Sequence, residues 1–256
     1  MNFNIEELLE RAKEFTLEAG NHTLNYFRKG IDVHFKGDAS PVTIADQEAE
    51  KILRKRIMES FPDHGILGEE YGSHLPASDI QWILDPIDGT QSFIHGIPIY
   101  TTLVGILVKG KPIVGVVYAP AMGEMLEAAV NFGARLNNNT TKVRPCNHIS
   151  EATVLTTDLK NITAYHFEEG HSKIMKECRL HRTWGDAYGH LMVASGRADV
   201  MIDPILNIWD AAPLTPILKE AGGIFMDRFG KENLKAGHGI SVGLGLKDEI
   251  VRHLQL

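Results

Sequence analysis

The chain contains little cysteine, no long apolar run and no excess of basic residues. Its two cysteines, Cys146 and Cys178, allow at most one disulfide, so we expect a reducing environment. No apolar run approaches the about 20 residues that a membrane-spanning helix requires. The amino terminus also lacks the basic and apolar segments of a secretory signal peptide. These absences predict a soluble, cytoplasmic protein.

The charge balance narrows the range of partners. The formal net charge is −7 and the sequence has no basic stripe, which argues against a nucleic-acid-binding surface. The 12 histidines are scattered, and no pair of them has zinc-ligand spacing with cysteine support. Where carboxylates bind metal ions, the ions neutralise part of this negative charge locally. We therefore expect a small-molecule partner, with no nucleic acid and no membrane.

The first half of the sequence has the pattern of helices followed by a sheet. With 43% hydrophobic and 23% charged residues, the 256-residue chain is long enough for one large domain or two closely packed halves. Apolar stripes with a 3.6-residue period predict helices at 5–29 and 44–60. Short apolar runs between turn residues predict strands at 65–67, 80–84, 101–108, 113–118 and 125–130. We expect a mostly antiparallel sheet, with a hairpin turn at 108–112, packed against the two helices.

The second half alternates between strands and helices. The predicted strands are 153–157, 200–202, 224–226 and 241–244, and the predicted helices are about 168–177, 186–197, 210–221 and 247–255. This is an α/β pattern, and the change of pattern near Pro145 to Ser150 divides the chain into halves 1–146 and 147–256. The polar run 137–141 is expected to be a loop.

The segment Asp85-Pro86-Ile87-Asp88-Gly89-Thr90 follows an apolar strand and carries the clearest chemical signal. Its two carboxylates can hold hard divalent cations, which prefer oxygen ligands. Phosphate-ester hydrolysis needs such cations and an activated water. Further carboxylates that could complete the site are Glu69 and Asp210, whereas Glu70 is expected to be a solvated neighbour. The alternative for Asp85 and Asp88 is an Asx-type turn.

Four separated segments resemble the inositol-monophosphatase-like family of metal-dependent, lithium-sensitive phosphatases. These segments are Val42 to Asp46, Gly68 to Glu70, Trp82 to Thr90, and Ile208 to Asp210 followed by Glu220 to Gly223. Their order and spacing match the family over nearly the whole chain. The resemblance implies a layered α-β-α-β-α fold with the site between the two halves, and a homodimer.

The resemblance also implies the metal ligands. In this family the residues that match Glu69, Asp85 and the backbone carbonyl of Ile87 bind a first metal ion, and those that match Asp85, Asp88 and Asp210 bind a second. The glutamate that matches Glu69 also contacts a weakly held third ion. Two to three Mg²⁺ ions are therefore expected, with Mn²⁺ as an alternative. Considered alone, Asp210 could instead cap the helix that it begins.

The resemblance also implies which residues activate the attacking water and which hold the phosphate. In this family the threonine that matches Thr90, supported by the aspartate that matches Asp46, activates the attacking water. Backbone N–H groups of Gly89 and Thr90 are expected to hold the phosphate at a helix N-terminus. Glu69 joins Thr90 and Asp46 in the predicted catalytic set. The alternative for Asp46 is a capping role, because it lies three residues after Thr43.

The substrate depends on residues about a hundred positions downstream. The pair Gly185-Asp186 matches the Gly-Asp pattern of histidinol-phosphate phosphatases, whereas inositol monophosphatases usually have small groups there. Asp203 matches a substrate-contacting acid in both branches, and Asp88 and Asp210 complete the predicted substrate-binding set. Acids at this end favour a cationic amine and imidazole over a neutral polyol. The alternative for Asp186 is a helix cap.

The predicted function is Mg²⁺-dependent hydrolysis of L-histidinol phosphate to L-histidinol and phosphate, a step of histidine biosynthesis, by a metal-activated water. Inositol 1-phosphate is the second candidate substrate. Nucleotide 3′-phosphates and fructose bisphosphate fit less well, because the chain is compact and has Thr90 after Gly89. A non-catalytic binding role is the third alternative, but no acid of the predicted metal set is missing.

Overall fold

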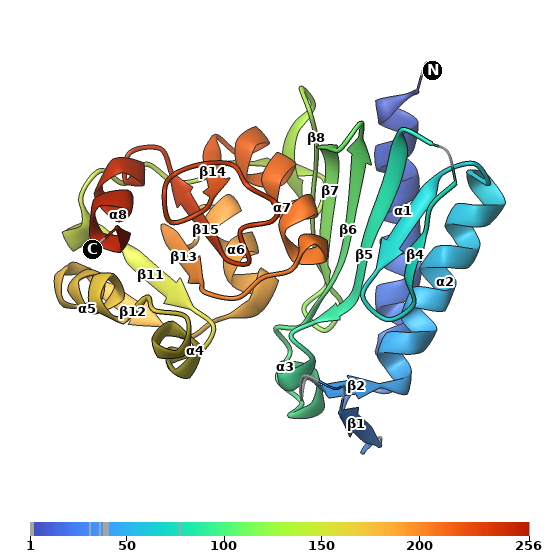
Figure 1. The fold of residues 1–256 in the computed structure, drawn as a ribbon, viewed down its shortest axis with the longest axis horizontal. Helices are drawn as coiled ribbons and strands as arrows, with labels where there is room; N and C mark the ends of the chain where they lie inside the picture. Colours follow the sequence, from blue (N-terminus) through green and yellow to red (C-terminus); the bar gives the residue numbers. More distant parts are fainter. Residues whose placement is uncertain (1–2, 31, 36, 38–40, 77, 256) are drawn as a thin grey trace.

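The computed structural model describes residues 3–30, 32–35, 37, 41–76 and 78–255, and these residues form five layers (Figure 1). Two long helices cover one face of a large sheet, a second pair of helices separates it from a smaller sheet, and further helices cover the outer face of the smaller sheet. The predicted α-β-α-β-α fold is thus confirmed.

The helices of the described residues are α1 (Ile5–Thr23), α2 (Ile44–Ser60), α3 (Thr90–Ile94), the 3₁₀ turn η1 (Ile149–Glu151), α4 (Leu159–Ala164), α5 (Glu168–Glu177), α6 (Asp186–Ala194), α7 (Ile208–Glu220) and α8 (Lys247–Leu254). Within the same residues, the strands are β1 (Val33–Phe35), β2 (Pro41–Thr43), β3 (Gly65–Gly68), β4 (Gly72–His74), β5 (Ile80–Asp88), β6 (Thr101–Val108), β7 (Lys111–Ala119), β8 (Glu124–Ala129), β9 (Gly133–Leu136), β10 (Asn139–Thr141), β11 (Thr153–Thr156), β12 (Leu180–Arg182), β13 (Val200–Asp203), β14 (Gly223–Met226) and β15 (Gly239–Gly243).

The larger sheet has the strand order β10-β9-β8-β7-β6-β5-β3-β4 among the described residues. All its neighbouring strands are antiparallel except β3 and β5, which agrees with the mostly antiparallel sheet that we predicted. Helices α1 and α2 pack on one face because their apolar stripes, which include Phe15 and Leu53, meet Trp82 and Ile106 of the sheet. Burial of these apolar side chains is the main force that holds the outer layer in place.

The middle layer is formed by α6 and α7, which are buried on nearly all sides. Helix α7 lies on a pair of glycines, Gly105 of β6 and Gly115 of β7, which are direct cross-strand partners. A Cβ atom on Gly115 would lie 2.0 Å from the carbonyl oxygen of Pro213, so only glycine permits this close approach. This close contact between helix and sheet fixes the position of the first turns of α7, and therefore of Asp210, relative to the large sheet.

The smaller sheet has the strand order β12-β11-β13-β15-β14 within the described part of the chain. Strands β12, β11 and β13 are parallel, and β15 pairs antiparallel with both β13 and β14. Its outer face packs against α4, α5 and α8 through one apolar cluster that includes Ile162, Ile174 and Ile250. Helix α7 of the second half packs on the sheet of the first half. The two halves therefore share a buried contact, and their division into 1–146 and 147–256 stays a prediction.

Several predicted boundaries differ from the structure. Helix α1 ends at Thr23 rather than near residue 29, because 24–29 form turns and Arg28 adopts a φ of +61°. The polar run 137–141 is a loop only in part, since Asn137 and Asn138 form the turn of a hairpin and β10 begins at Asn139. Left-handed backbone at consecutive asparagines is typical of such turns. The short elements β1, β2, β4, α3, β9, η1, α4 and β12 were not predicted.

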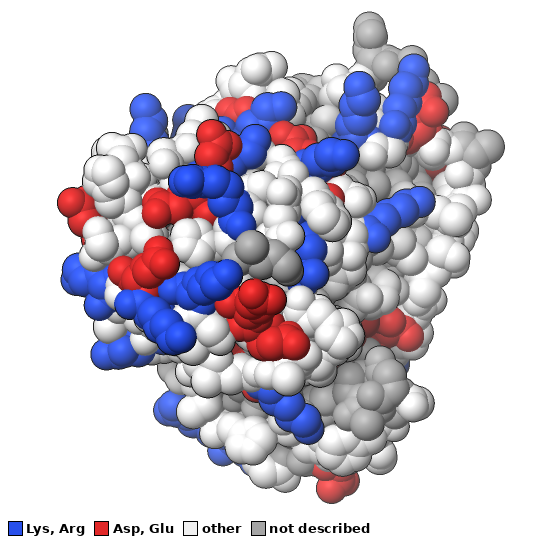
Figure 2. All heavy atoms as spheres, turned by 60° about the vertical axis from the view of Figure 1, so that its left-hand side comes forward, with Lys and Arg blue, Asp and Glu red and all other residues white. Residues whose placement is uncertain are grey.

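Three further findings concern the length of the apolar helices, the surface charge and the cysteines. No helix among the described residues is long and apolar enough to cross a membrane. On the face drawn in Figure 2, Lys and Arg side chains are interspersed with Asp and Glu among the described residues. Interspersed charges of both signs do not produce a broad potential of one sign over that face. The two cysteines, Cys146 and Cys178, form no disulfide.

Candidate active site

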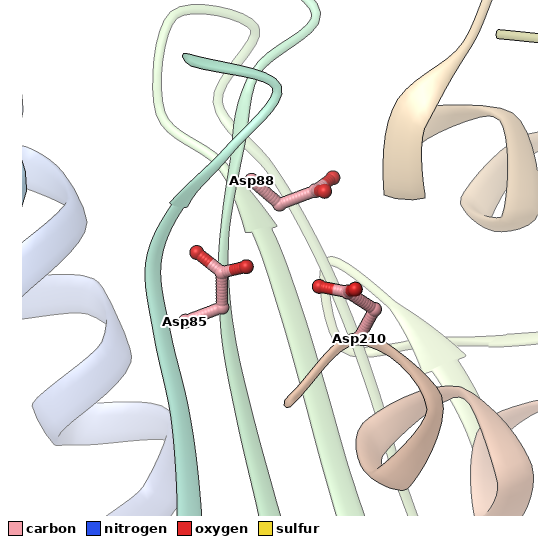
Figure 3. A group of neighbouring side chains, drawn as sticks. All are labelled: Asp85, Asp88 and Asp210. Carbon is pink, nitrogen blue, oxygen red and sulfur yellow. The ribbon is translucent and has the colours of Figure 1, made fainter. Parts of the chain in front are cut away.

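The end of β5 places the first two carboxylates of the site. Strand β5 is almost fully buried, and its pairing with β6 becomes irregular between Asp85 and Asp88. This irregularity turns both carboxylates toward the same side of the sheet edge (Figure 3). Gly89 follows with a φ of +79°, and this left-handed residue begins the short helix α3 at Thr90. The predicted turn is therefore the end of a longer strand than expected.

Asp210 completes a cluster of three acids. Asp85, Asp88 and Asp210 each offer a carboxylate oxygen within 4.8 Å of the other two, and Figure 3 shows their side chains facing a common space. Asp210 also accepts a hydrogen bond of 2.7 Å from the backbone N–H of Asn207. The prediction that Asp210 is the N-cap is wrong, because Asn207 caps α7 and Asp210, in the third helical position, completes the capping box.

A small pocket of about 120 Å³ unites the predicted metal and phosphate residues. It is lined by Glu69, Asp85, Ile87, Asp88, Gly89, Thr90, Asn207, Trp209 and Asp210. Every residue that the sequence predicted as a metal ligand or phosphate contact therefore lies at one place. Asn207 and Trp209 were not predicted as site residues, although they are close in sequence to Asp210.

Thr90 and Asp46 lie side by side at the edge of this pocket. The Thr90 Oγ1 lies 3.4 Å from Asp46 Oδ1 and 3.0 Å from the carbonyl oxygen of Ile87. The other oxygen, Asp46 Oδ2, accepts hydrogen bonds from the backbone N–H and hydroxyl of Thr43 at 2.7 and 2.6 Å. Asp46 therefore caps α2 and reaches Thr90 at once. Burial raises its pKa to about 6, although the bonds from Thr43 oppose this shift.

A larger pocket of about 410 Å³ shares Asp88 and Asp210 with the small one and leads away from it. Its remaining lining residues are Gln91, Ser92, Ile99, Thr157, Asp158, Asn161, Thr183, Gly185, Asp186, Asp203, Ile205 and Leu206. Five of the described lining residues are aspartates, and none of the described lining residues is lysine, arginine or histidine. The carboxylates of this pocket therefore have no cationic side chain to pair with among its described lining residues.

Asp186 contributes a carboxylate where the two pockets meet. Its Oδ2 accepts a hydrogen bond of 3.2 Å from the Ser92 hydroxyl, and a Cβ atom on Gly89 would lie 2.7 Å from the same oxygen. The helix-cap alternative is wrong, because it is Asp88 whose Oδ2 accepts the backbone N–H of Ala187 at 2.6 Å in the first turn of α6. Burial raises the pKa of Asp186 to about 6.

Asp203 ends strand β13 and lies on the wall of the larger pocket. Its Oδ2 accepts a hydrogen bond of 2.9 Å from the Thr157 hydroxyl. Burial raises the pKa of Asp203 to about 8, and the neighbouring carboxylate of Asp186 adds to the shift. Gly185 lines the same pocket, so the structure brings together all five residues of the predicted substrate-binding set.

Comparisons with known proteins identify the family. Residues 4–255 match the model of the inositol monophosphatase family. The chain belongs to this family. It is similar to a protein named histidinol-phosphatase from Chlorobaculum parvum, with 40% identity over 91% of this chain and 90% of the relative. It is also similar to inositol monophosphatase 3 of Solanum lycopersicum, with 30% identity over 99% and 98% of the two chains.

A solved structure supports the same assignment. The inositol monophosphatase of Thermotoga maritima superposes with a TM-score of 0.89 and has 29% identity, covering 97% of each chain. The chain is therefore a phosphatase, a phosphoric monoester hydrolase of a metal-dependent family. Its homologues act on small phosphorylated substrates. The predicted family is thus confirmed.

The acidic cluster of this phosphatase fits bound cations. Burial and the neighbouring acids raise the pKa values of Asp85 and Asp88 well above their usual range, and burial raises that of Asp210 to about 7. The buried Asp85 Oδ1 has no hydrogen-bond partner among the described residues. An unpaired buried carboxylate oxygen is costly unless a cation approaches it. The donor set consists of oxygens, which suits Mg²⁺ or Mn²⁺.

Two residues that bond the acids of the larger pocket were also missed in the sequence. Ser92 follows the segment 85–90 by two residues, and Thr157 lies at the carboxyl end of a predicted strand. The side chains at the carboxyl ends of neighbouring parallel strands meet at one sheet edge, which could have linked Thr157 to Asp203. The contact between Ser92 and Asp186 spans 94 residues, and no local signal could have revealed it.

Proposed function

We propose that this phosphatase hydrolyses L-histidinol phosphate to L-histidinol and phosphate, with Mg²⁺ as its cofactor. The observation that carries the proposal is the position of the Asp186 and Asp203 carboxylates on one pocket wall without a lysine, arginine or histidine among the described residues lining that pocket. The similarity to relatives named histidinol-phosphatase from Chlorobaculum parvum and Mycobacterium tuberculosis agrees with this substrate.

The phosphate end of the substrate belongs in the small pocket. Glu69, Asp85, Asp88, Asp210 and the carbonyl oxygen of Ile87 would hold the cations there. Bound Mg²⁺ supplies positive charge to the phosphoryl and leaving oxygens and lowers the pKa of a water. A phosphate dianion could not otherwise approach this group of carboxylates, because like charges repel strongly in a partly buried site. The backbone N–H groups of Gly89 and Thr90 are proposed to orient the phosphate.

Thr90 and Asp46 are proposed to handle the attacking water. A Thr90 hydroxyl that donates to Asp46 keeps its lone pairs free to accept a hydrogen bond from that water. Asp46 is held rigidly by its two bonds from Thr43, so the hydroxyl has a fixed direction. A carboxylate with a pKa of about 6 is also suited to accept a proton near neutral pH.

The alcohol end of the substrate belongs in the larger pocket. Histidinol phosphate carries an amine that is cationic at neutral pH and an imidazole that can become cationic. A cationic group beside Asp186 or Asp203 favours the ionised carboxylate and so opposes the raised pKa values of these acids. Each charge-assisted hydrogen bond to such a carboxylate would contribute about 1.5–3 kcal/mol. A neutral ring would also remove water from these carboxylates, but it would offer them no positive charge to offset the free-energy cost.

Inositol 1-phosphate is the second candidate substrate, because relatives and solved structures named inositol monophosphatase match nearly the whole chain. Its hydroxyl groups could donate to Asp203, but they bring no positive charge to Asp186. The homodimer, the cytoplasmic location and the lithium sensitivity remain predictions.

The experiment that tests the substrate compares phosphate release from histidinol phosphate and inositol 1-phosphate with Mg²⁺. The wild-type protein should have the higher kcat/KM for histidinol phosphate. Asp186→Ala should lower the ratio of the two kcat/KM values about tenfold or more, because one charged hydrogen bond is lost. Asp186→Asn, which keeps the shape but not the charge, is the matched variant. An unchanged ratio in both variants would refute the role of Asp186.

A further inference from the structure

Thr157 connects the two carboxylates of the substrate pocket. Its Oγ1 accepts a hydrogen bond of 2.9 Å from the backbone N–H of Asp186 and donates one of 2.9 Å to Asp203 Oδ2. A hydroxyl has one proton to donate and lone pairs to accept, and both functions are used here. This single group therefore fixes the main chain of one acid relative to the side chain of the other.

We propose that Thr157 is a positioning residue that determines substrate specificity by setting the spacing of Asp186 and Asp203. The inference deepens the proposed function and rests on it, since it assumes that these two acids contact the alcohol part of the substrate. Neither the family resemblance nor the motifs of the sequence assign a role to Thr157.

The topology of the smaller sheet places Thr157 beside Asp203. Strands β11 and β13 are parallel neighbours, and Thr156 is the register partner of Ile202. The next residues are Thr157, directly after β11, and Asp203, the last residue of β13, so both lie at the same edge of the sheet. Side chains at the carboxyl ends of parallel strands form the ligand-binding edge in α/β sheets.

The approach of Asp186 to Thr157 depends on close packing and on an unusual backbone. A Cβ atom on Gly185 would lie 2.4 Å from Thr157 Cα, so glycine allows the chain before α6 to touch the end of β11. Asp186 has a φ of +53°, a conformation that costs free energy for a non-glycine residue. The bonds from its N–H to Thr157 and from Ser92 to its carboxylate compensate for this strain. Losing the Thr157 hydroxyl should therefore let Asp186 relax away from its position.

The neighbouring Thr156 provides a matched control. It is fully buried, and its Oγ1 has no hydrogen-bond partner among the described residues. Successive side chains of a strand point to opposite faces, so Thr156 does not share the environment of Thr157. Thr156→Val removes the same atom as Thr157→Val from a buried position without breaking a hydrogen bond.

The test measures kcat and KM of Thr157→Val, Thr157→Ser and Thr156→Val for histidinol phosphate and inositol 1-phosphate. Thr157→Val should lower the kcat/KM ratio of the two substrates about tenfold, mainly through a higher KM for histidinol phosphate. Thr157→Ser keeps the hydroxyl and should restore the ratio to within about threefold of wild type. Thr156→Val should leave the ratio unchanged. Thr157→Ala replaces the valine variant if that variant does not fold, as judged by thermal unfolding.

Two results would overturn the inference. An unchanged ratio in Thr157→Val, or an equal loss for both substrates, would mean that the hydroxyl has only a structural role. Failure of the proposed function has a different signature, because it would appear in the wild-type protein as a preference for inositol 1-phosphate. In that case the role of Thr157 is still tested separately. It is rejected if Thr157→Val and Thr156→Val have the same ratio of kcat/KM values for the two substrates.

Discussion

Single carboxylates in this site serve the backbone and the chemistry at the same time. Asp46 completes the capping box of α2 and reaches Thr90, and Asp210 completes that of α7 and joins the acidic cluster. Asp88 accepts an N–H from the first turn of α6. Capping and function therefore did not compete for these residues. A carboxylate has two oxygens and several lone pairs, which allows one oxygen to bond the backbone while the other faces the pocket.

Asp88→Asn tests the metal assignment at this scale. The amide oxygen can still accept the Ala187 N–H, so we expect the fold and melting temperature to remain close to wild type. Turnover should fall more than about 100-fold, because even residues behind a metal ligand can cost 10–100-fold when they are replaced. Phosphate release and circular dichroism check both expectations. The exposed Asp79→Asn is the control, and near-normal activity of Asp88→Asn would disprove the assignment.

At the scale of elements, helix α2 supports the site at two positions one turn apart. Asp46 faces Thr90, and the buried Glu50 holds the turn that carries Glu69. Glu50 Oε2 accepts the N–H of Glu70 at 2.7 Å, and Oε1 accepts the N–H of Tyr71 at 3.2 Å and Arg54 Nε at 2.7 Å. The helix therefore determines where Glu69 stands relative to Asp85.

Glu50→Gln should weaken metal binding. A glutamine has one acceptor oxygen, so at least one of the three donors would face an NH₂ group. We expect about tenfold weaker binding of Mn²⁺, measured by isothermal titration calorimetry. Glu127→Gln is the matched control, since Glu127 is also buried but pairs with Lys13 at 3.0 Å on the outer layer. Equal effects of the two variants on Mn²⁺ affinity would contradict a specific role of Glu50.

The hydrophobic pattern located the long elements, although it misplaced the ends of α1 and β5, and it missed most of the short ones. Helices at 44–60 and 168–177 and the strand 101–108 agree with α2, α5 and β6 to the residue. These segments have enough turns or alternations for a period to be recognised. Short elements such as α3 and β12 have too few residues for a period, and their positions depend on contacts with distant segments.

At the scale of the whole molecule, the site is assembled from both sheets and the helices between them. Asp85 and Asp88 come from the large sheet, Asp203 from the small one, and Asp186 and Asp210 from the middle helices. The glycine pair under Pro213 allows α7 to come close enough for Asp210 to meet Asp85. The price of this assembly is a concentration of buried negative charge.

Metal binding should therefore stabilise the whole protein, and more so at higher pH. Burial raises the pKa of Asp46, Asp210 and Asp203 to about 6, 7 and 8. Without metal, the folded chain binds protons that the unfolded chain releases above about pH 4, so the free energy of unfolding decreases as the pH rises through these values. Cations bound to the ionised Asp85, Asp88 and Asp210 would offset the part of this loss that comes from the acidic cluster.

Thermal unfolding with Mg²⁺ and with a chelator measures the effect. At a Mg²⁺ concentration of about 100 times Kd, we expect a rise in melting temperature of about 5–10 °C at about pH 8 and a smaller rise at about pH 5.5. Asp88→Asn should show a reduced rise at both pH values. A Mg²⁺ effect that is larger at the lower pH would contradict the buried charge as its origin.

The sequence by itself determined the presence of the long helices and strands, the family and the group of acids that lines the small pocket. These features depend on local periodicity and on motifs whose residues are adjacent in the chain, so they can be recognised without coordinates. The tertiary structure alone decided that Asp88 rather than Asp186 accepts the backbone N–H of Ala187 in α6, and that Ser92 and Thr157 bond the residues of the larger pocket. Those contacts join residues 29 to 99 positions apart, and their geometry follows from the packing of the layers rather than from any local pattern.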